Sequence, residues 1–244
     1  MLLFHCADLH IGSGDIAEGV NCLHHMADEV IGSKADALLI AGDLFDRAAR
    51  YPAAEAAVHA LMRLQQANVP VYCVDGNHDE CMLAEPDCLG LLHRRSLIHL
   101  LYPVRDAAGE PHIAAYDGKT GCVAYAGGVR IIGFGFLGDT TKERLLSLSR
   151  ELEPYDGFTI ALLHTGVYDG EVPLGGIVQG DLRAFDGLVD YFALGHRHAR
   201  EEHGNAFNPG ALCCVRMNAP NEEHGYYRIC VEGRAFSGQF VPAR

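Results

Sequence analysis

The sequence lacks several features that mark common classes of protein. It has no uninterrupted apolar run of the roughly 18 residues that a helix needs to cross a bilayer. Its first residues, 1–8, carry neither the basic region nor the cleavage site of a secretory signal peptide. We therefore expect a protein with no membrane association, located in the cytoplasm.

Cysteine pairs with metal-binding or redox spacing are also missing. No Cys-x-x-Cys occurs, although the chain has nine cysteines, an odd number. Several stand in apolar runs, where a free thiol behaves as a small hydrophobic group. A cysteine zinc cluster and a disulfide framework are both disfavoured, and a reduced, cytoplasmic protein is favoured.

Basic residues are scarce. Lys and Arg number 19 against 32 Asp and Glu, which gives a formal net charge of −13. Nucleic-acid affinity normally rests on neutralisation of phosphates by Lys and Arg. Two bound divalent cations would offset about four of these charges and leave the surface acidic. If DNA is the substrate, the contact must be local, and binding modest and sensitive to salt.

What the sequence does contain is enough apolar material for one large core. With 244 residues and 49% hydrophobic content, we expect a single domain over residues 1–244. Helical patterns alternate with short β-rich runs, which indicates an α/β fold with two sheets packed face to face and flanked by helices. We expect strands at 2–6, 37–41, 69–74, 113–116, 122–125, 129–134, 158–163, 190–194 and 226–231. We expect helices at 15–31, 52–66 and 139–152.

Polar motifs follow five of the apolar segments, where each strand should give way to a loop. They are Asp8-Leu9-His10, the segment 42–47, Gly76-Asn77-His78-Asp79, the single His164, and the segment 195–198. In open α/β sheets, sites are built at this carboxyl edge of the strands. Together the motifs supply enough carboxylate, amide and imidazole groups for a two-metal site with one histidine to spare.

These donor types indicate a particular chemistry. Hard divalent cations such as Mn²⁺ accept carboxylate, amide oxygen and imidazole together. A carboxylate such as Asp43 can bridge two ions through its two oxygens. Two ions about 3.5–4 Å apart clamp the attacking and leaving oxygens of an in-line phosphoryl displacement and lower the pKa of a bridging water. The motifs therefore predict phosphoester hydrolysis by metal-activated water, without a serine or cysteine nucleophile.

The five motifs, in this order, resemble the calcineurin-like metallophosphoesterase superfamily. That resemblance covers nearly the whole chain and implies a four-layer double β-sandwich flanked by helices. Within the superfamily, the segments Ala7–Gly12, Gly42–Asp46 and Ile131–Phe136 resemble the SbcD-type DNA double-strand-break repair exonucleases. The implied function is hydrolysis of phosphodiester bonds, with DNA as the substrate.

The resemblance also implies a role for each site residue. One metal ion would be held by Asp8, His10, Asp43 and His198, and a second by Asp43, Asn77, His164 and His196. His78 would bind no metal but would stabilise or protonate the leaving oxygen of the scissile phosphate. Asp46 would orient His78, and Arg47 would contact phosphate. We expect manganese, with iron, zinc or magnesium as the alternatives.

Two departures from the nuclease pattern leave other functions open. The repair nucleases usually carry a DNA-capping domain and a tail that docks on an SbcC-type coiled-coil ATPase, whereas this chain stops at Arg244, soon after its last predicted strand. A phosphodiesterase or phosphatase acting on a small nucleotide or a phosphoprotein is the alternative, favoured by the acidic surface and the Asp46-Arg47 pair. A non-catalytic scaffold is disfavoured because His78 and the ligands are all present. The oligomeric state and the choice between exo- and endonuclease polarity stay open.

Histidines outside the motifs are expected to serve other purposes. His5 alternates with the core residues of the first strand, and we expect it to be a hydrogen-bonded interior residue. The turn at 208–211 is expected to be structural.

Overall fold

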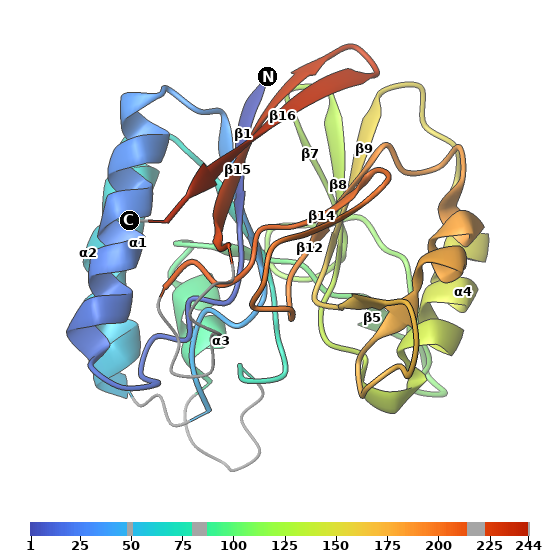
Figure 1. The fold of residues 1–244 in the computed structure, drawn as a ribbon, viewed down its shortest axis with the longest axis horizontal. Helices are drawn as coiled ribbons and strands as arrows, with labels where there is room; N and C mark the ends of the chain where they lie inside the picture. The colour runs from blue at the N-terminus through green and yellow to red at the C-terminus, as the bar shows by residue number, and fades with distance from the viewer. Residues whose placement is uncertain (48–50, 80–86, 214–222, 244) are drawn as a thin grey trace.

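Two six-stranded sheets lie face to face in the computed structural model, which describes residues 1–47, 51–79, 87–213 and 223–243 (Figure 1). The first sheet has the strand order β16 (Ala235–Pro242), β15 (Gly225–Glu232), β1 (Leu2–Cys6), β2 (Ala37–Ala41), β3 (Val71–Val74), β4 (His99–Leu100). The second has the order β13 (Glu201–His203), β14 (Ala206–Asn208), β12 (Tyr191–Leu194), β9 (Phe158–Leu163), β8 (Val129–Phe134), β7 (Val123–Ala126).

The centre of each sheet is parallel. Strands β1 to β4 run in one direction, and β8, β9, β12 and β14 do so in the second sheet. Antiparallel strands β15 and β16 extend the first sheet, and β7 and β13 close the edges of the second. The carboxyl ends of the parallel strands therefore gather at one edge of each sheet, where the polar motifs follow them.

Helices cover the outer face of each sheet. The first sheet is covered by α1 (Ile16–Gly32), α2 (Tyr51–Gln66) and α3 (Cys88–Arg94), and the second by α4 (Thr141–Glu151) with the 3₁₀ helices η1 (Gly138–Thr140) and η2 (Gln179–Phe185) (Figure 1). Two short ribbons complete the described elements: β5 (Val104–Arg105) with β6 (Pro111–His112), and β10 (Val167–Tyr168) with β11 (Ile177–Val178). This arrangement confirms the expected four-layer double β-sandwich.

Alternation along the strands sorts the core into layers. In β1, Leu3 faces the second sheet and joins the core between the sheets, whereas Phe4 packs under the helices. In β2, Leu39 likewise lies between the sheets, and Leu38 packs under the helices. Both faces of these strands are buried, so they read as continuous apolar runs rather than as alternating polar and apolar residues.

His5 is the polar exception within β1. Its Nδ1 lies 3.0 Å from the hydroxyl of Tyr191, and its Nε2 lies 3.0 Å from the carbonyl oxygen of Leu194. Burial lowers the pKa of His5 to about 3, so the ring is neutral. The expectation of a hydrogen-bonded interior histidine is confirmed, and the bonds join β1 to the opposite sheet.

Helix α1 shows why the sequence starts a helix at this point. The side chain of Asp15 accepts a hydrogen bond from the N–H of Ala17 at 2.9 Å and so caps the first turn. Leu23, Met26 and Val30 lie on one face and are buried against the first sheet. Among the described residues, no helix has both the length and the apolar character that a membrane-spanning segment requires.

The structure differs locally from the sequence-based expectation at a strand and at a helix. The strand expected at 113–116 is absent, because only Ala115 forms a bridge, with Val123, while the N–H of Ile113 donates to the carboxylate of Glu151 at 3.0 Å. Helix α3 was not expected from the sequence. Its seven residues are too few to show a clear apolar period, although Asp87 caps it by accepting a bond from the N–H of Gly90.

Candidate metal centre

The polar motifs of both sheets meet where the parallel strands end. Asp8 and His10 follow β1, Asp43 follows β2, and Asn77 follows β3. His164 follows β9, and His196 and His198 follow β12. The structure therefore brings all the residues predicted as ligands to one region, although they lie far apart in the sequence.

Backbone hydrogen bonds join the first two of these loops. The N–H of Asp8 donates to the carbonyl of Gly42 at 3.1 Å, and the N–H of His10 donates to the carbonyl of Asp43 at 2.9 Å. The N–H of Ile11 then donates to the carbonyl of Leu44 at 3.0 Å. The loop after β1 is thus held in fixed register with the loop after β2.

One group of donors surrounds His10. Its Nε2 lies 3.1 Å from Nε2 of His198, 3.9 Å from a carboxylate oxygen of Asp8 and 3.7 Å from one of Asp43. Asp8 and His10 are almost completely buried. Asp8, His10 and His198 form a cluster whose ligand atoms could contact a single ion.

A second group of donors surrounds His164. Its Nε2 lies 3.3 Å from a carboxylate oxygen of Asp43 and 3.1 Å from the amide oxygen of Asn77. The same amide oxygen lies 2.9 Å from Nδ1 of His196. His164 donates the N–H of its other ring nitrogen, Nδ1, to the carbonyl of Ala41 at 2.7 Å, so Nε2 is the nitrogen that faces the other donors and would bind a metal after losing its proton.

Asp43 lies between the two groups. One of its oxygens, Oδ2, is within 3.7 Å of His10 and 3.3 Å of His164, while Oδ1 accepts the N–H of His78 at 2.7 Å. The carboxylate that the sequence singles out as a bridge therefore has a predicted ligand of each ion beside it.

The backbone at these residues is strained. Asp8, His10, Asp43 and His196 have positive φ angles of 55°, 47°, 50° and 79°. Such conformations cost a non-glycine residue of order 1–3 kcal/mol and persist where the surrounding structure over-determines them. Four strained residues in one cluster indicate that the positions of these side chains are fixed at the expense of backbone stability.

Two glycines permit the close approach of the loops. A Cβ atom at Gly76 would lie 2.1 Å from a carboxylate oxygen of Asp43, and one at Gly42 would lie 2.2 Å from Nδ1 of His164. Gly42 also has a φ of 85°. No larger residue fits at either position without displacing a predicted ligand.

Burial and the close approach of opposite charges shift the pKa values of the carboxylates and imidazoles in the cluster. Burial lowers the pKa of His10 and of His196 to about 4, so both rings are neutral at pH 7. Burial also opposes the charged form of His164, but attraction to Asp43 outweighs it and raises the pKa of His164 to about 10. For Asp43, burial is likewise outweighed by attraction to His164, which holds its pKa below the usual range.

The donor set fits divalent metal ions. Burial raises the pKa of the Asp8 carboxyl well above its ordinary value, although attraction to His164 partly opposes this. Nδ1 of His10 is buried and has no hydrogen-bond partner among the described residues, and the Nε2 atoms of His10 and His198 face each other. Carboxylate, amide oxygen and imidazole suit Mn²⁺, Fe²⁺ and Zn²⁺. A cation shared by these groups would compensate the cost of burying them together.

The residues predicted to act on phosphate lie beside this cluster. Nδ1 of His78 lies 3.2 Å from a carboxylate oxygen of Asp46, and both side chains are partly exposed. The exposed Arg47 donates its Nε–H to the carbonyl of Asn77 at 3.0 Å. The rings of His10 and His78 meet edge to face, with centroids 4.7 Å apart.

Asp79 has a role that the sequence analysis did not assign. Its carboxylate accepts hydrogen bonds from the N–H groups of Phe45 at 2.8 Å, Gly76 at 2.9 Å and Leu44 at 3.3 Å. It therefore ties the loop after β3 to the loop after β2. The only signal in the sequence is its place after His78. That position does not distinguish a carboxylate that holds two loops together from a solvated turn residue.

Curated proteins with sequences similar to this chain include several DNA double-strand break repair proteins. The chain is 26% identical over 205 residues to the DNA double-strand break repair protein Mre11 of Sulfurisphaera tokodaii, a match that covers 81% of this chain and 49% of that protein. It is 27% identical over 247 residues to the Mre11 protein of Methanopyrus kandleri, covering 93% of this chain and 52% of that protein. The chain thus spans about half the length of these curated relatives.

Solved structures share the fold. A dimetal phosphatase from Danio rerio aligns with a TM-score of 0.61 at 14% identity, covering 100% of this chain and 99% of that one. The protein TT1561 of Thermus thermophilus aligns with a TM-score of 0.56, also at 14% identity, over 100% of this chain and 99% of that one.

A match to a protein-family model identifies the family of this chain. The model for calcineurin-like phosphoesterases matches residues 1–200, a range that includes every predicted ligand and His78. This chain therefore belongs to the calcineurin-like phosphoesterase family, whose members are metal-dependent hydrolases.

Proposed function

We propose that this protein hydrolyses phosphodiester bonds of DNA with two divalent metal ions. The observation that carries the proposal is the position of Asp43 between two donor groups, with His78 beside them. Members of the family typically bind two divalent metals. The relatives named DNA double-strand break repair proteins direct the choice of substrate toward DNA.

The proposed ligand sets follow the two donor groups. Asp8, His10, Asp43 and His198 would hold one ion, and Asp43, Asn77, His164 and His196 the other. The ions would supply Lewis acidity toward the phosphoryl oxygens and a water of lowered pKa. Manganese is the proposed metal, with iron, zinc and magnesium as alternatives that the same donors accept.

His78 would act on the leaving group. Asp46 accepts a hydrogen bond from Nδ1 of His78, so Nε2 is the ring atom left to carry a proton to the departing oxygen. The carboxylate of Asp46 would also stabilise the imidazolium that must form before that transfer. The bond from His78 N–H to Asp43 keeps the residue next to the bridging position without making its ring a ligand.

Arg47 would hold the substrate. Its guanidinium is exposed, and its bond to the carbonyl of Asn77 keeps it next to His78. A planar guanidinium is suited to bidentate contact with phosphate oxygens. With a formal net charge of −13, the protein has few other ways to attract a polyanion, so DNA binding should depend on the metal centre and weaken steeply with salt.

A second function uses the same centre. A phosphatase or phosphodiesterase that acts on a small nucleotide or a phosphoprotein would need no extended basic surface, and the net charge of −13 favours it. Both functions share the ligands and His78, so they differ only in which phosphoester reaches the ions.

The deciding experiment is cleavage of end-labelled single- and double-stranded DNA by the Mn²⁺-loaded protein. Parallel reactions would contain His78→Ala and, as a matched control, His59→Ala, which removes an exposed histidine on α2. Cleavage that is lost in His78→Ala but kept in His59→Ala supports the proposal. Intact DNA from protein that still hydrolyses a chromogenic phosphodiester would favour the small-substrate function.

A further inference from the structure

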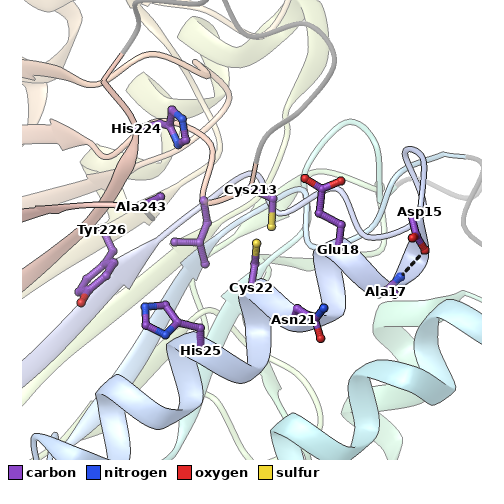
Figure 2. A pocket seen from close by; sticks show the side chains of 11 residues that line it. Asp15, Ala17, Glu18, Asn21, Cys22, His25, Cys213, His224, Tyr226 and Ala243 are labelled. Atoms are coloured by element: carbon purple, nitrogen blue, oxygen red, sulfur yellow. Dashed lines mark hydrogen bonds between the residues drawn. The ribbon is translucent and has the colours of Figure 1, made fainter.

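Two cysteine thiols that belong to neither predicted ligand set face each other. Cys22 lies on α1, and Cys213 lies on the segment after β14, beyond the bridge between Ala211 and Ala7. Figure 2 shows the two sulfur atoms pointing toward one another across the gap between these segments. The thiols are hydrogen-bonded to each other, and both are in the reduced form.

A pocket of about 740 Å³ opens onto the pair. His25, His224 and Tyr226 line it together with the two cysteines (Figure 2). Cys22 is partly exposed, whereas Cys213 is buried. A small molecule in the pocket can therefore reach the sulfur of Cys22, with that of Cys213 next to it.

The contact makes the two thiols chemically unequal. The hydrogen bond from Cys213 lowers the pKa of Cys22, and this outweighs the opposite effects of burial and of the nearby Glu18. The same contact, together with burial, raises the pKa of Cys213. The thiolate is the nucleophilic form of cysteine, so Cys22 is the thiol prepared to attack.

A metal site is a weaker interpretation of this pocket. Within the described part of the chain, groups of three or more side chains close enough to share an ion occur only among residues of the metal centre and the adjoining Asp46 and His78. The cysteines, His25 and His224 do not form such a group. The hydrogen bond between Cys22 and Cys213 already brings two sulfur atoms together. That arrangement favours formation of a disulfide over binding of a metal.

We propose that Cys22 and Cys213 are a dithiol that hydrogen peroxide oxidises to a disulfide. In the first step, the Cys22 thiolate attacks one oxygen of the peroxide, the O–O bond breaks, and Cys22 becomes a sulfenic acid while hydroxide leaves. In the second step, the sulfur of Cys213 attacks that of Cys22, and the S–O bond breaks. The leaving hydroxide and the Cys213 proton form water, and the hydroxide of the first step takes up the proton that Cys22 lost to form a second water. In sum, two thiols and one peroxide give one disulfide and two waters.

The disulfide would join α1 to the edge of the metal centre. The N–H of Ala211 donates to the carbonyl of His198 at 2.9 Å, and the N–H of Leu212 donates to the carbonyl of Ala7 at 3.1 Å. Ala7 precedes Asp8 in the chain. Oxidation would therefore attach a helix to the segment that contacts the backbone of two predicted ligand loops.

Mapping of the oxidised full chain tests the proposal. Trypsin cleaves after Lys34, Arg200 and Arg216, so Cys22 and Cys213 fall on different peptides. After treatment of the reduced protein with peroxide, we expect a cross-linked pair of peptides 1–34 and 201–216, with fragmentation placing the bond between Cys22 and Cys213. Free thiols at both positions, or a bond to Cys6 or Cys214 instead, would overturn it.

Single variants test the order of the two steps. In Cys213→Ser, the sulfenic acid on Cys22 lacks its proposed partner thiol and should be labelled by dimedone, whereas Cys213 in Cys22→Ser should stay unlabelled. Cys230→Ser, which removes an exposed cysteine on β15, is the matched control and should form the disulfide normally. Thermal melting of each variant establishes that it is folded. Equal dimedone labelling of Cys22 and Cys213 in the two folded variants would contradict the proposed roles.

Discussion

The two sheets contribute different chemistry to the metal centre. The first sheet supplies the oxygen donors Asp8, Asp43 and Asn77, with the single imidazole of His10. The second supplies imidazoles only, from the loops after β9 and β12. Each donor group combines oxygen ligands from one sheet with imidazoles from the other. The centre can therefore be complete only when the two sheets are packed together.

The sheets also differ in how their loops are held. The loops of the first sheet are joined to one another by backbone bonds and by the carboxylate of Asp79. The second sheet docks onto them: His164 donates to the carbonyl of Ala41, and the N–H of His196 donates to the carboxylate of Asp8 at 3.0 Å. The ligand loops of the first sheet are thus held by bonds among themselves, whereas those of the second sheet are held by bonds to the first sheet.

Asp43→Ala should have the largest effect on this arrangement. It removes the one carboxylate that lies beside both donor groups, so we expect both ions to be lost and activity to fall to background. Elemental analysis of the purified protein would measure this, with Asp139→Ala, at an exposed aspartate of η1, as the control. Loss of a single ion would refute the bridging role.

His78→Ala should separate catalysis from metal binding. The ring of His78 belongs to neither ligand set, so the metal content should be unchanged while the rate falls by about 10²–10⁴, the range for a positioned acid or base. Steady-state kinetics together with elemental analysis would show this difference. Full activity in the variant would exclude His78 from the mechanism.

Metal binding should release a proton from the interface between the sheets. Without metal, His164 has a pKa of about 10 and is protonated at pH 7, whereas His10 and His196, with pKa values of about 4, are already neutral. A cation must displace the proton from His164, so Mn²⁺ affinity should rise as pH increases from 7 toward 10, and the proton of His164 should be released at pH 7.

Calorimetric titrations with Mn²⁺ in buffers of different ionisation enthalpy would count this proton. His164→Gln should remove the part of the release that comes from His164, and His59→Ala should preserve the release. An affinity independent of pH over this interval would show that the pair of His164 and Asp43 does not hold a proton.

Asp79→Asn should have the smallest effect of these changes. An amide keeps one acceptor oxygen but turns its NH₂ toward backbone N–H groups, so we expect a loss of stability of about 1–3 kcal/mol. Urea unfolding of the metal-free protein would measure it, with Asp139→Asn as the exposed control. Unchanged stability would mean that the loops of the first sheet hold together without this carboxylate.

Much of this architecture is readable from the sequence because each ligand follows a buried strand. The apolar runs at β1, β2, β9 and β12 end directly before the motifs, and a parallel sheet brings such ends together. The positive φ of Asp8 and His10 could not be predicted, since neither is glycine and the strain is imposed by contacts with distant loops. The contact of Cys22 with Cys213 likewise depends on packing between segments far apart in the chain.

The failed strand at 113–116 shows a different limit. Its apolar residues are compatible with a strand, and Ala114 and Tyr116 do bond the backbone of residues 122–123. Ile113 instead donates to a side chain of α4, so the pairing is limited to the single bridge at Ala115. Local composition does not reveal that competition.

The alternation of Leu3 and Phe4 along β1 has a consequence for how this chain can vary. A change of side chain in β1 alters the packing of one layer, whereas an inserted or deleted residue exchanges the layers for the residues of the strand that follow it. It would also shift Asp8 out of register with Gly42. Substitutions in these strands should therefore accumulate among descendants of this sequence far more readily than changes of strand length.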